Sequence, residues 1–177
     1  LSRTADDLEM FGIDDGSRLR FEYLFPFGRG RRPWSSSMAQ ATAAQALSRA
    51  AKVTGERRHA IAASRAFREL VSPSTSVRSG GRVQRFTMYS FQPSMRVLNG
   101  ELQTLVGLAD YARMADSTRA RRVLRHTARR MVRSLGAWDT GAWTLYSAGG
   151  REATLHYHEL AATFAGRACE RRLARGF

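Results

Sequence analysis

Cysteine and lysine are almost absent from this chain of 177 residues, and long apolar runs are missing altogether. Cys169 is the single cysteine, which excludes an intrachain disulfide and a zinc site built from cysteines. No apolar run approaches the roughly 18 residues that predict a membrane-spanning helix. The glycine pairs at 28–30 and 80–81 lack the strand–turn–helix context of a nucleotide-binding loop. Membrane spans and dinucleotide cofactors are therefore not expected.

The charge is strongly of one sign, with 29 basic against 15 acidic residues and a net charge of +14. Lys52 is the only lysine, so nearly all of the basic residues are arginines. Such a field favours polyanionic partners, either an acidic polysaccharide or a nucleic acid. The sequence has no paired cysteines and histidines, no aromatic RNA-binding signature and no basic region with a zipper, so nucleic acid is the less favoured partner.

Helical periodicity dominates the chain after Trp34. The length of the whole chain suits a single domain over residues 1–177. Residues 1–33 are predicted to be an irregular or extended lead-in, in which Phe21, Tyr23 and Phe25 alternate along one face. Serines before an alanine-rich stretch and a glycine after it bound the first predicted helix. The predicted helical segments are 35–55, 56–70, 95–111, 117–136 and 158–176.

Loops of alternating length separate these helices into pairs, which predicts a mainly all-α fold with short β segments in the loops. The first two helices form an antiparallel hairpin because their link is so short. The connection over 72–94 is long enough to suggest a functional loop, and residues 137–150 form a turn between short extended pieces. The pattern fits an incomplete α/α toroid, but it slightly favours a plain bundle, since five helices are too few to close a ring.

Four segments, taken together and in this order, resemble the C-terminal domain of the D-glucuronyl C-5 epimerases, enzymes that convert D-glucuronic into L-iduronic residues in heparan-type chains. The preceding RFEYLFPFGRGRRPW also fits that family, and the likeness spans roughly residues 18–175. The resemblance implies an α/α toroid whose active cleft lies at one mouth, between loops. The segments are PWSSSMAQATAAQALSRAAKVTG at 33–55, SMRVLNGELQTLVGLADYA at 94–112, WDTGAWTLY at 138–146 and LHYHEL at 155–160.

Epimerisation at carbon 5 removes a proton next to a carboxylate and returns one to the opposite face, so it needs two proton-transfer groups. It also needs cations to hold the uronate, but no cofactor and no metal. A phenol is a poor base unless nearby arginines favour the phenolate. The resemblance implies catalytic roles for Tyr89, Tyr146 and Tyr157. The candidates for binding the substrate are His158, which follows Tyr157, and the arginines near these motifs, Arg82, Arg85, Arg96 and Arg151.

Several polar positions of the family carry other residues here. Met88 stands where the family has a carboxylate, and Ala161 replaces the second histidine of its Tyr-His-x-x-His run. Gly149 and Ser147 replace an arginine and an aspartate that follow the Tyr146 position. These departures leave three readings open: an epimerase acting on an acidic polysaccharide, a non-catalytic family member that binds anionic glycans, or a related uronate lyase.

The tryptophans Trp34, Trp138 and Trp143 could stack on sugar rings, although core packing is the better reading for at least two of them. The sequence leaves a homodimer open. The resemblance also leaves an extracytoplasmic or secreted location open, although no charged-then-apolar leader is visible.

Overall fold

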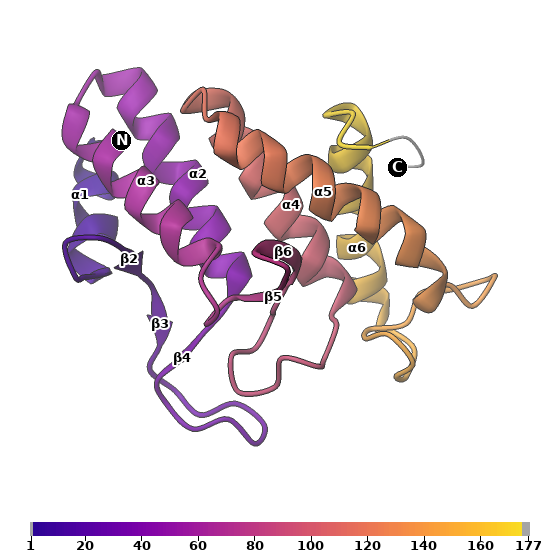
Figure 1. The fold of residues 1–177 in the computed structure, drawn as a ribbon. Helices are drawn as coiled ribbons and strands as arrows, with labels where there is room; N and C mark the ends of the chain where they lie inside the picture. The colour runs from indigo at the N-terminus through magenta and orange to yellow at the C-terminus, as the bar shows by residue number, and fades with distance from the viewer. Residues whose placement is uncertain (1, 175–177) are drawn as a thin grey trace.

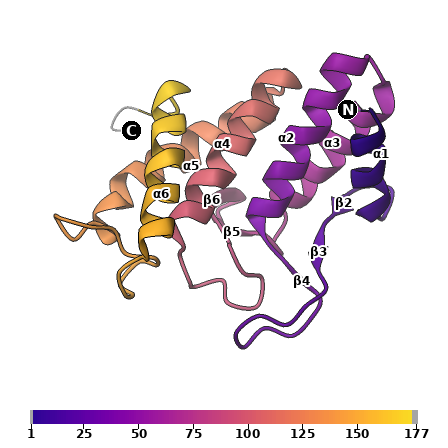
Figure 2. The same cartoon turned by 180° about the vertical axis from the view of Figure 1, so that it is seen from behind.

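Six α-helices make up most of residues 2–174, the part of the chain that the computed structural model describes. They form two layers: α2, α4 and α6 in one and α3 and α5 in the other, with α1 beside α2 (Figures 1 and 2). The protein is thus mainly helical, as predicted. The helices are α1 (Ser2–Phe11), α2 (Ser37–Thr54), α3 (Arg57–Leu70), α4 (Leu98–Met114), α5 (Thr118–Ser134) and α6 (Leu155–Glu170).

The first hairpin, α2 with α3, begins and ends as the sequence predicts. The Ser36 side chain accepts a hydrogen bond from the backbone N–H of Met38, and Gly55 ends α2 with a φ of 74°. A serine N-cap and a left-handed glycine satisfy backbone groups that a helix end otherwise leaves unpaired. The alanine-rich face of α2 lies against both α3 and α4, where Leu47 and Leu70 are fully buried.

The second hairpin, α4 with α5, places one helix at the centre of the molecule and one at its surface. Almost every residue of α4 is buried, because α2, α5 and α6 all pack on it. The helix α5 is amphipathic: Ala128 and Met131 face inward, while most of its arginines are exposed. The helix predicted from Met95 begins at Leu98, and the last helix begins at Leu155 rather than at His158. Residues 175–176 of that predicted helix lie outside the described residues.

Three short antiparallel hairpins decorate the helices, and each pairs two strands. The third lies inside the connection predicted over 72–94, where Gly80 and Gly81 both have positive φ and form the tight turn. The strands are β1 (Ile13–Asp14), β2 (Leu19–Arg20), β3 (Glu22–Tyr23), β4 (Trp34–Ser35), β5 (Ser76–Ser79) and β6 (Arg82–Phe86).

The prediction that residues 1–33 are irregular is wrong for Ser2–Phe11, which form α1. Ala5 is buried and Leu8 packs against the core, while the Glu9 carboxylate contacts the buried His59 ring on α3. Tertiary packing therefore stabilises a helix whose few apolar residues give little local signal. Within the described part of the chain, no helix is both long and apolar enough to cross a bilayer.

Candidate functional site

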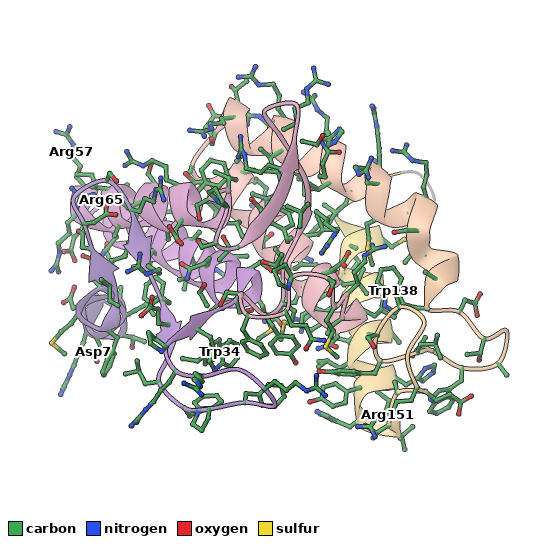
Figure 3. The ribbon with its side chains drawn as sticks, turned by 60° about the horizontal axis from the view of Figure 1, so that its bottom comes forward. Asp7, Trp34, Arg57, Arg65, Trp138 and Arg151 are labelled. Atoms are coloured by element: carbon green, nitrogen blue, oxygen red, sulfur yellow. The ribbon has the colours of Figure 1, made fainter. Side chains whose placement is uncertain are left out.

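Three connections meet at one end of the helical layers: the arm formed by residues 22–35, the segment 87–97 and the loop 138–153. All three lie at the bottom of Figure 1, and Figure 3 looks toward that end, where Trp34, Trp138 and Arg151 are labelled. Backbone bonds tie the connections together. The Ser90 N–H donates to Ser35 O (3.0 Å) and the Leu98 N–H donates to Tyr146 O (3.2 Å).

The arm over residues 22–35 is a hairpin stiffened by aromatic rings. Phe27 and Gly30 exchange two backbone hydrogen bonds near its tip, and β3 pairs with β4 at its base. The Tyr23 ring stacks on Trp34 at 4.1 Å, and the Trp34 indole donates to Phe25 O at 2.9 Å. Trp34 is buried, so the predicted packing role is confirmed for it.

Tyr89 lies under this arm and is buried, with 4% of its surface exposed. Its ring stacks on Phe27 at 5.3 Å and lies 5.4 Å from the ring of Phe91. The Tyr89 hydroxyl shares a hydrogen bond of 2.9 Å with the hydroxyl of Tyr146, which comes from the 138–153 loop. Two tyrosines separated by 57 residues in sequence thus meet hydroxyl to hydroxyl.

Tyr157 completes the group from the first turn of α6. Its ring meets Tyr146 edge to face at 4.9 Å, and it is 38% exposed. We call Tyr89, Tyr146 and Tyr157 the tyrosine cluster. The cluster extends from the buried phenol of Tyr89 to the exposed phenol of Tyr157. The three residues assigned catalytic roles therefore lie side by side.

Burial is the main reason why the pKa of Tyr89 is raised well above its ordinary value. The hydrogen bond with Tyr146 and the neighbouring Tyr157 and Tyr23 raise this pKa further. No arginine is among these causes. Because its pKa is raised, the neutral phenol is favoured at Tyr89, which can share a hydrogen bond with Tyr146 but is unsuited to act as the initial base.

Arg151, on the 138–153 loop, and His158, on the helix α6 that follows it, lie beside the cluster. The His158 ring stacks on Trp143 at 4.0 Å, and its Nδ1 lies 3.0 Å from the Thr144 hydroxyl. Arg151 O accepts the backbone N–H of Tyr146 at 3.0 Å, while the Arg151 side chain is exposed. His158 thus fastens α6 to the loop that carries Tyr146.

The other three predicted ligands lie apart from the cluster, in two pockets beside α5. Arg96 forms a two-pronged ion pair with Glu101, at 2.9 and 3.0 Å, and its guanidinium covers the Trp138 ring at 4.4 Å. Arg85 and Arg96 line one cavity of about 90 Å³, and Arg82 lines another of about 380 Å³. Neither cavity is lined by a residue of the tyrosine cluster.

The model of one protein family, described as D-glucuronyl C5-epimerase C-terminus, matches residues 15–165. The chain belongs to this D-glucuronyl C5-epimerase family. The matched range includes the arm and the whole tyrosine cluster. A search of curated proteins finds no match.

Two of the positions at which this epimerase-family chain departs from the expected polar residues, Met88 and Ala161, are engaged in packing, and Gly149 is exposed. The Met88 sulfur accepts the Ser36 hydroxyl at 3.6 Å and lies directly over Gly100, where an added Cβ would be 2.6 Å from it. Ala161 is buried and lines an apolar pocket of about 200 Å³ beside His158. Gly149 has a φ of 69° in a tight turn. In the residues that the structure describes, no group of three or more His, Cys, Asp or Glu is placed to hold a metal ion.

Sequence reasoning missed Phe27 and Phe91, the rings that wall Tyr89. Phe27 is 47% exposed and stacks on Tyr89. Phe91 packs so close to Gly30 that a Cβ there would overlap its ring. The alternating aromatics over 20–27 carried the signal, but only the fold shows which of them cover Tyr89. Trp138 is buried and confirmed as a packing residue, and its indole donates to Arg96 O at 3.2 Å.

Proposed function

We propose that this protein acts on D-glucuronyl residues of an acidic polysaccharide, removing the proton at carbon 5 and returning one to the opposite face of the sugar. It would then be an isomerase that epimerises a carbohydrate. The observation that carries the proposal is the hydroxyl contact between Tyr89 and Tyr146, with Tyr157 packed against Tyr146 at an exposed position. Membership of the epimerase family supports the same chemistry.

The proposed reaction assigns the tyrosines different roles. Tyr157, the most accessible of the three, acts as the phenolate and takes the carbon-5 proton as the C–H bond breaks, and the electron pair passes into the adjacent carboxylate as an enolate. Tyr146 gives its phenol proton to carbon 5 from the other face and is left as a phenolate. Tyr89, kept neutral by burial, donates its hydrogen bond to that phenolate, and proton exchange with water then restores the Tyr146 phenol and the Tyr157 phenolate. Arg151 pairs with the uronate carboxylate.

His158 is assigned a positioning role in this scheme. Its stacking on Trp143 and its contact with Thr144 join α6 to the loop. This junction holds the loop that carries Tyr146 against the helix that carries Tyr157. We also propose that the two helical layers form part of an α/α toroid within a single domain over residues 1–177, with the tyrosine cluster at its mouth.

A second candidate function is binding of anionic glycans without catalysis. The side chain of Met88 supports it, because that residue is engaged in packing over Gly100 and cannot transfer a proton. The neutral Tyr89 supports it as well, since no charged partner replaces the missing carboxylate. A uronate lyase is the third candidate, because it would begin with the same proton abstraction.

Deuterium exchange distinguishes the three candidates. A glucuronate-containing oligosaccharide is incubated with the protein in heavy water, and label at carbon 5 is measured by NMR together with conversion to iduronate. We expect label in the parent and an approximately hundredfold slower rate in Tyr157→Phe, the usual scale for losing a general base. Tyr111→Phe, a matched change within α4, should label at the parent's rate.

Each other result contradicts part of the proposal. Glycan binding without label would favour the non-catalytic function, and an unsaturated product absorbing in the near ultraviolet would indicate a lyase. Exchange in Tyr157→Phe as fast as in the parent would remove the role assigned to Tyr157.

A further inference from the structure

The surface between β6 and α5 carries an unusual concentration of arginine. In Figure 3 the β5–β6 hairpin extends along α5 on the opposite side of the view from Arg151. Two cavities open between these elements, and we call them together the β6–α5 seam. Its charged and polar lining residues are Arg78, Arg82, Arg119, Arg122 and His126 in the larger cavity, and Gln84, Arg85, Arg96, Glu101, Thr127, Arg130 and Ser134 in the smaller one.

The larger cavity has a volume of about 380 Å³, and none of its lining residues is acidic. Arg78 donates to the neutral carbonyls of Val71 and Gly81. Burial is the largest cause that lowers the pKa of His126, and the charges of Arg130, Arg82 and Arg133 lower this pKa further. Positive charges are therefore gathered around this cavity without local compensation.

The smaller cavity contains a guanidinium nitrogen with no partner. Nη1 of Arg85 is buried and has no hydrogen-bond partner among the described residues. Glu101 is engaged by Arg96 through two hydrogen bonds, and Arg130 donates its Nε to Gln84 O. Leaving a charged donor unsatisfied is costly, and an oxyanion in the cavity would satisfy it.

The two cavities are spaced along the seam in a way that suits a chain of charges. Arg122 and Arg130 are eight residues apart on α5, which is about 12 Å at the rise of an α-helix. Arg82 and Arg85 are three residues apart on β6, about 10 Å for an extended strand. A single small anion could occupy only one cavity, whereas an extended polymer with regularly spaced anions could reach both.

We propose that the β6–α5 seam is a second binding surface for acidic polysaccharide, at which two uronate carboxylates of one chain occupy the two cavities. The identity of the polymer rests on the proposed function, whereas the surface itself rests on the seam's arginines. Phe86, the one aromatic residue among the lining residues, is buried. Because single-stranded nucleic acids are held by exposed stacking aromatics, a polysaccharide fits the seam better. The surface would hold the polymer outside the tyrosine cluster.

The test compares arginine-to-glutamine changes at two residues of the seam, Arg122 and Arg85, with the same change at an exposed helix position outside it. Arg122→Gln alters the seam, and Arg57→Gln makes the same charge change on α3, far from α5 (Figure 3). Binding of a fluorescent glucuronate-containing oligosaccharide is followed by polarisation at low and at physiological salt. We expect Arg122→Gln and Arg85→Gln each to weaken binding about fivefold at low salt and Arg57→Gln by less than about twofold, with smaller effects at higher salt.

Equal weakening by Arg57→Gln would show that only the overall charge matters, and would overturn the proposal. Absence of binding by the parent would overturn it too, as would tighter binding of a single-stranded oligonucleotide of equal charge. The outcome is separable from the proposed reaction. Weaker binding by Arg122→Gln without deuterium label would uphold the seam and reject catalysis. Label with parental binding by Arg122→Gln would do the reverse.

Discussion

Met88 stands one residue before Tyr89, where the epimerase resemblance leads one to expect a carboxylate. Its side chain is half-buried, packs with the Trp34, Tyr89 and Val97 group, and covers Gly100 in the first turn of α4. The hydroxyl of Ser36 points at its sulfur. The position therefore contributes packing at the entrance of α4 and offers no acid or base to the neighbouring phenol.

Replacing Met88 by glutamate should raise the rate of carbon-5 exchange by tenfold or more, because a carboxylate beside Tyr89 supplies an acid or base. The Ser36 hydroxyl would donate to the new carboxylate. The same change should lower the free energy of unfolding by about 1–3 kcal/mol, because a charged group enters a partly apolar place. Deuterium exchange and urea unfolding measure the two effects.

Met88→Gln is the matched control for that substitution. Glutamine has nearly the same shape and polarity but transfers no proton, so its exchange rate should stay at the parental level. Equal gains from glutamate and glutamine would show that polarity alone matters at position 88. Such a result would contradict the proton-transfer role expected of a carboxylate at this position.

At the scale of elements, α2 and α4 cross at close range. A Cβ added at Gly107 would lie 3.0 Å from both the carbonyl carbon and the carbonyl oxygen of Ala41. Small residues on both helices thus let the two backbones approach closely. This proximity places the N-terminus of α4, and with it the segment 87–97, directly beside the base of the arm.

Gly107→Ala should destabilise the protein by about 1–3 kcal/mol, because the backbone of α2 cannot yield as a flexible side chain would. Gly166→Ala is the control: it lies in α6, and an added Cβ would meet nothing within 4 Å. The control should raise the free energy of unfolding by about 0.5–1 kcal/mol through helix propensity. Urea unfolding of both variants checks the pair, and a loss in both would contradict the crossing argument.

Sequence reasoning works best for elements whose ends are encoded locally. Ser36 and Gly55 bound α2, and the Ser117 side chain accepts a hydrogen bond from the Ala120 N–H at the start of α5. The sequence therefore predicts the limits of these two helices closely. By contrast, α1 depends on burial of Ala5 against other helices. For the β5–β6 hairpin the sequence predicts only a loop, although the pair Gly80 and Gly81 lies at its turn.

The site was predictable in part for a similar reason. Family motifs placed Tyr89, Tyr146 and Tyr157 in loops at one end, and the structure brings those three together. Motifs say nothing about the direction of a long flexible side chain. Arg96 extends to Glu101 and Ser134, and Arg85 lines the seam. Both placements depend on how β6 packs on α5.

At the scale of the whole molecule, a net charge of +14 makes the few buried carboxylates important. Asp110 is buried on α4 and accepts hydrogen bonds from Arg171 at 2.9 and 3.0 Å and from Gln45 at 2.6 Å. Gln45 belongs to α2, and Arg171 directly follows α6. One carboxylate therefore joins three helices of the same layer.

Asp110→Asn should lower the free energy of unfolding at pH 7 by about 3 kcal/mol, because it leaves Arg171 without its buried partner. Burial alone would raise the pKa of Asp110, but the hydrogen bonds from Arg171 and Gln45 and the charges of Arg171 and Arg113 outweigh it and hold this pKa below its ordinary value. The ionised form is thus favoured by folding, and its contribution is fully present above the unfolded carboxyl pKa of about 3.9. It is lost as the pH falls through the lower folded value, so parent and variant should approach equal stability in strong acid.

Asp116→Asn, which changes an exposed carboxylate paired with Arg121, should match the parent at every pH. Urea unfolding from pH 7 down to pH 2 measures the difference, and a gap that stayed constant over that range would reject the role of the Asp110 charge.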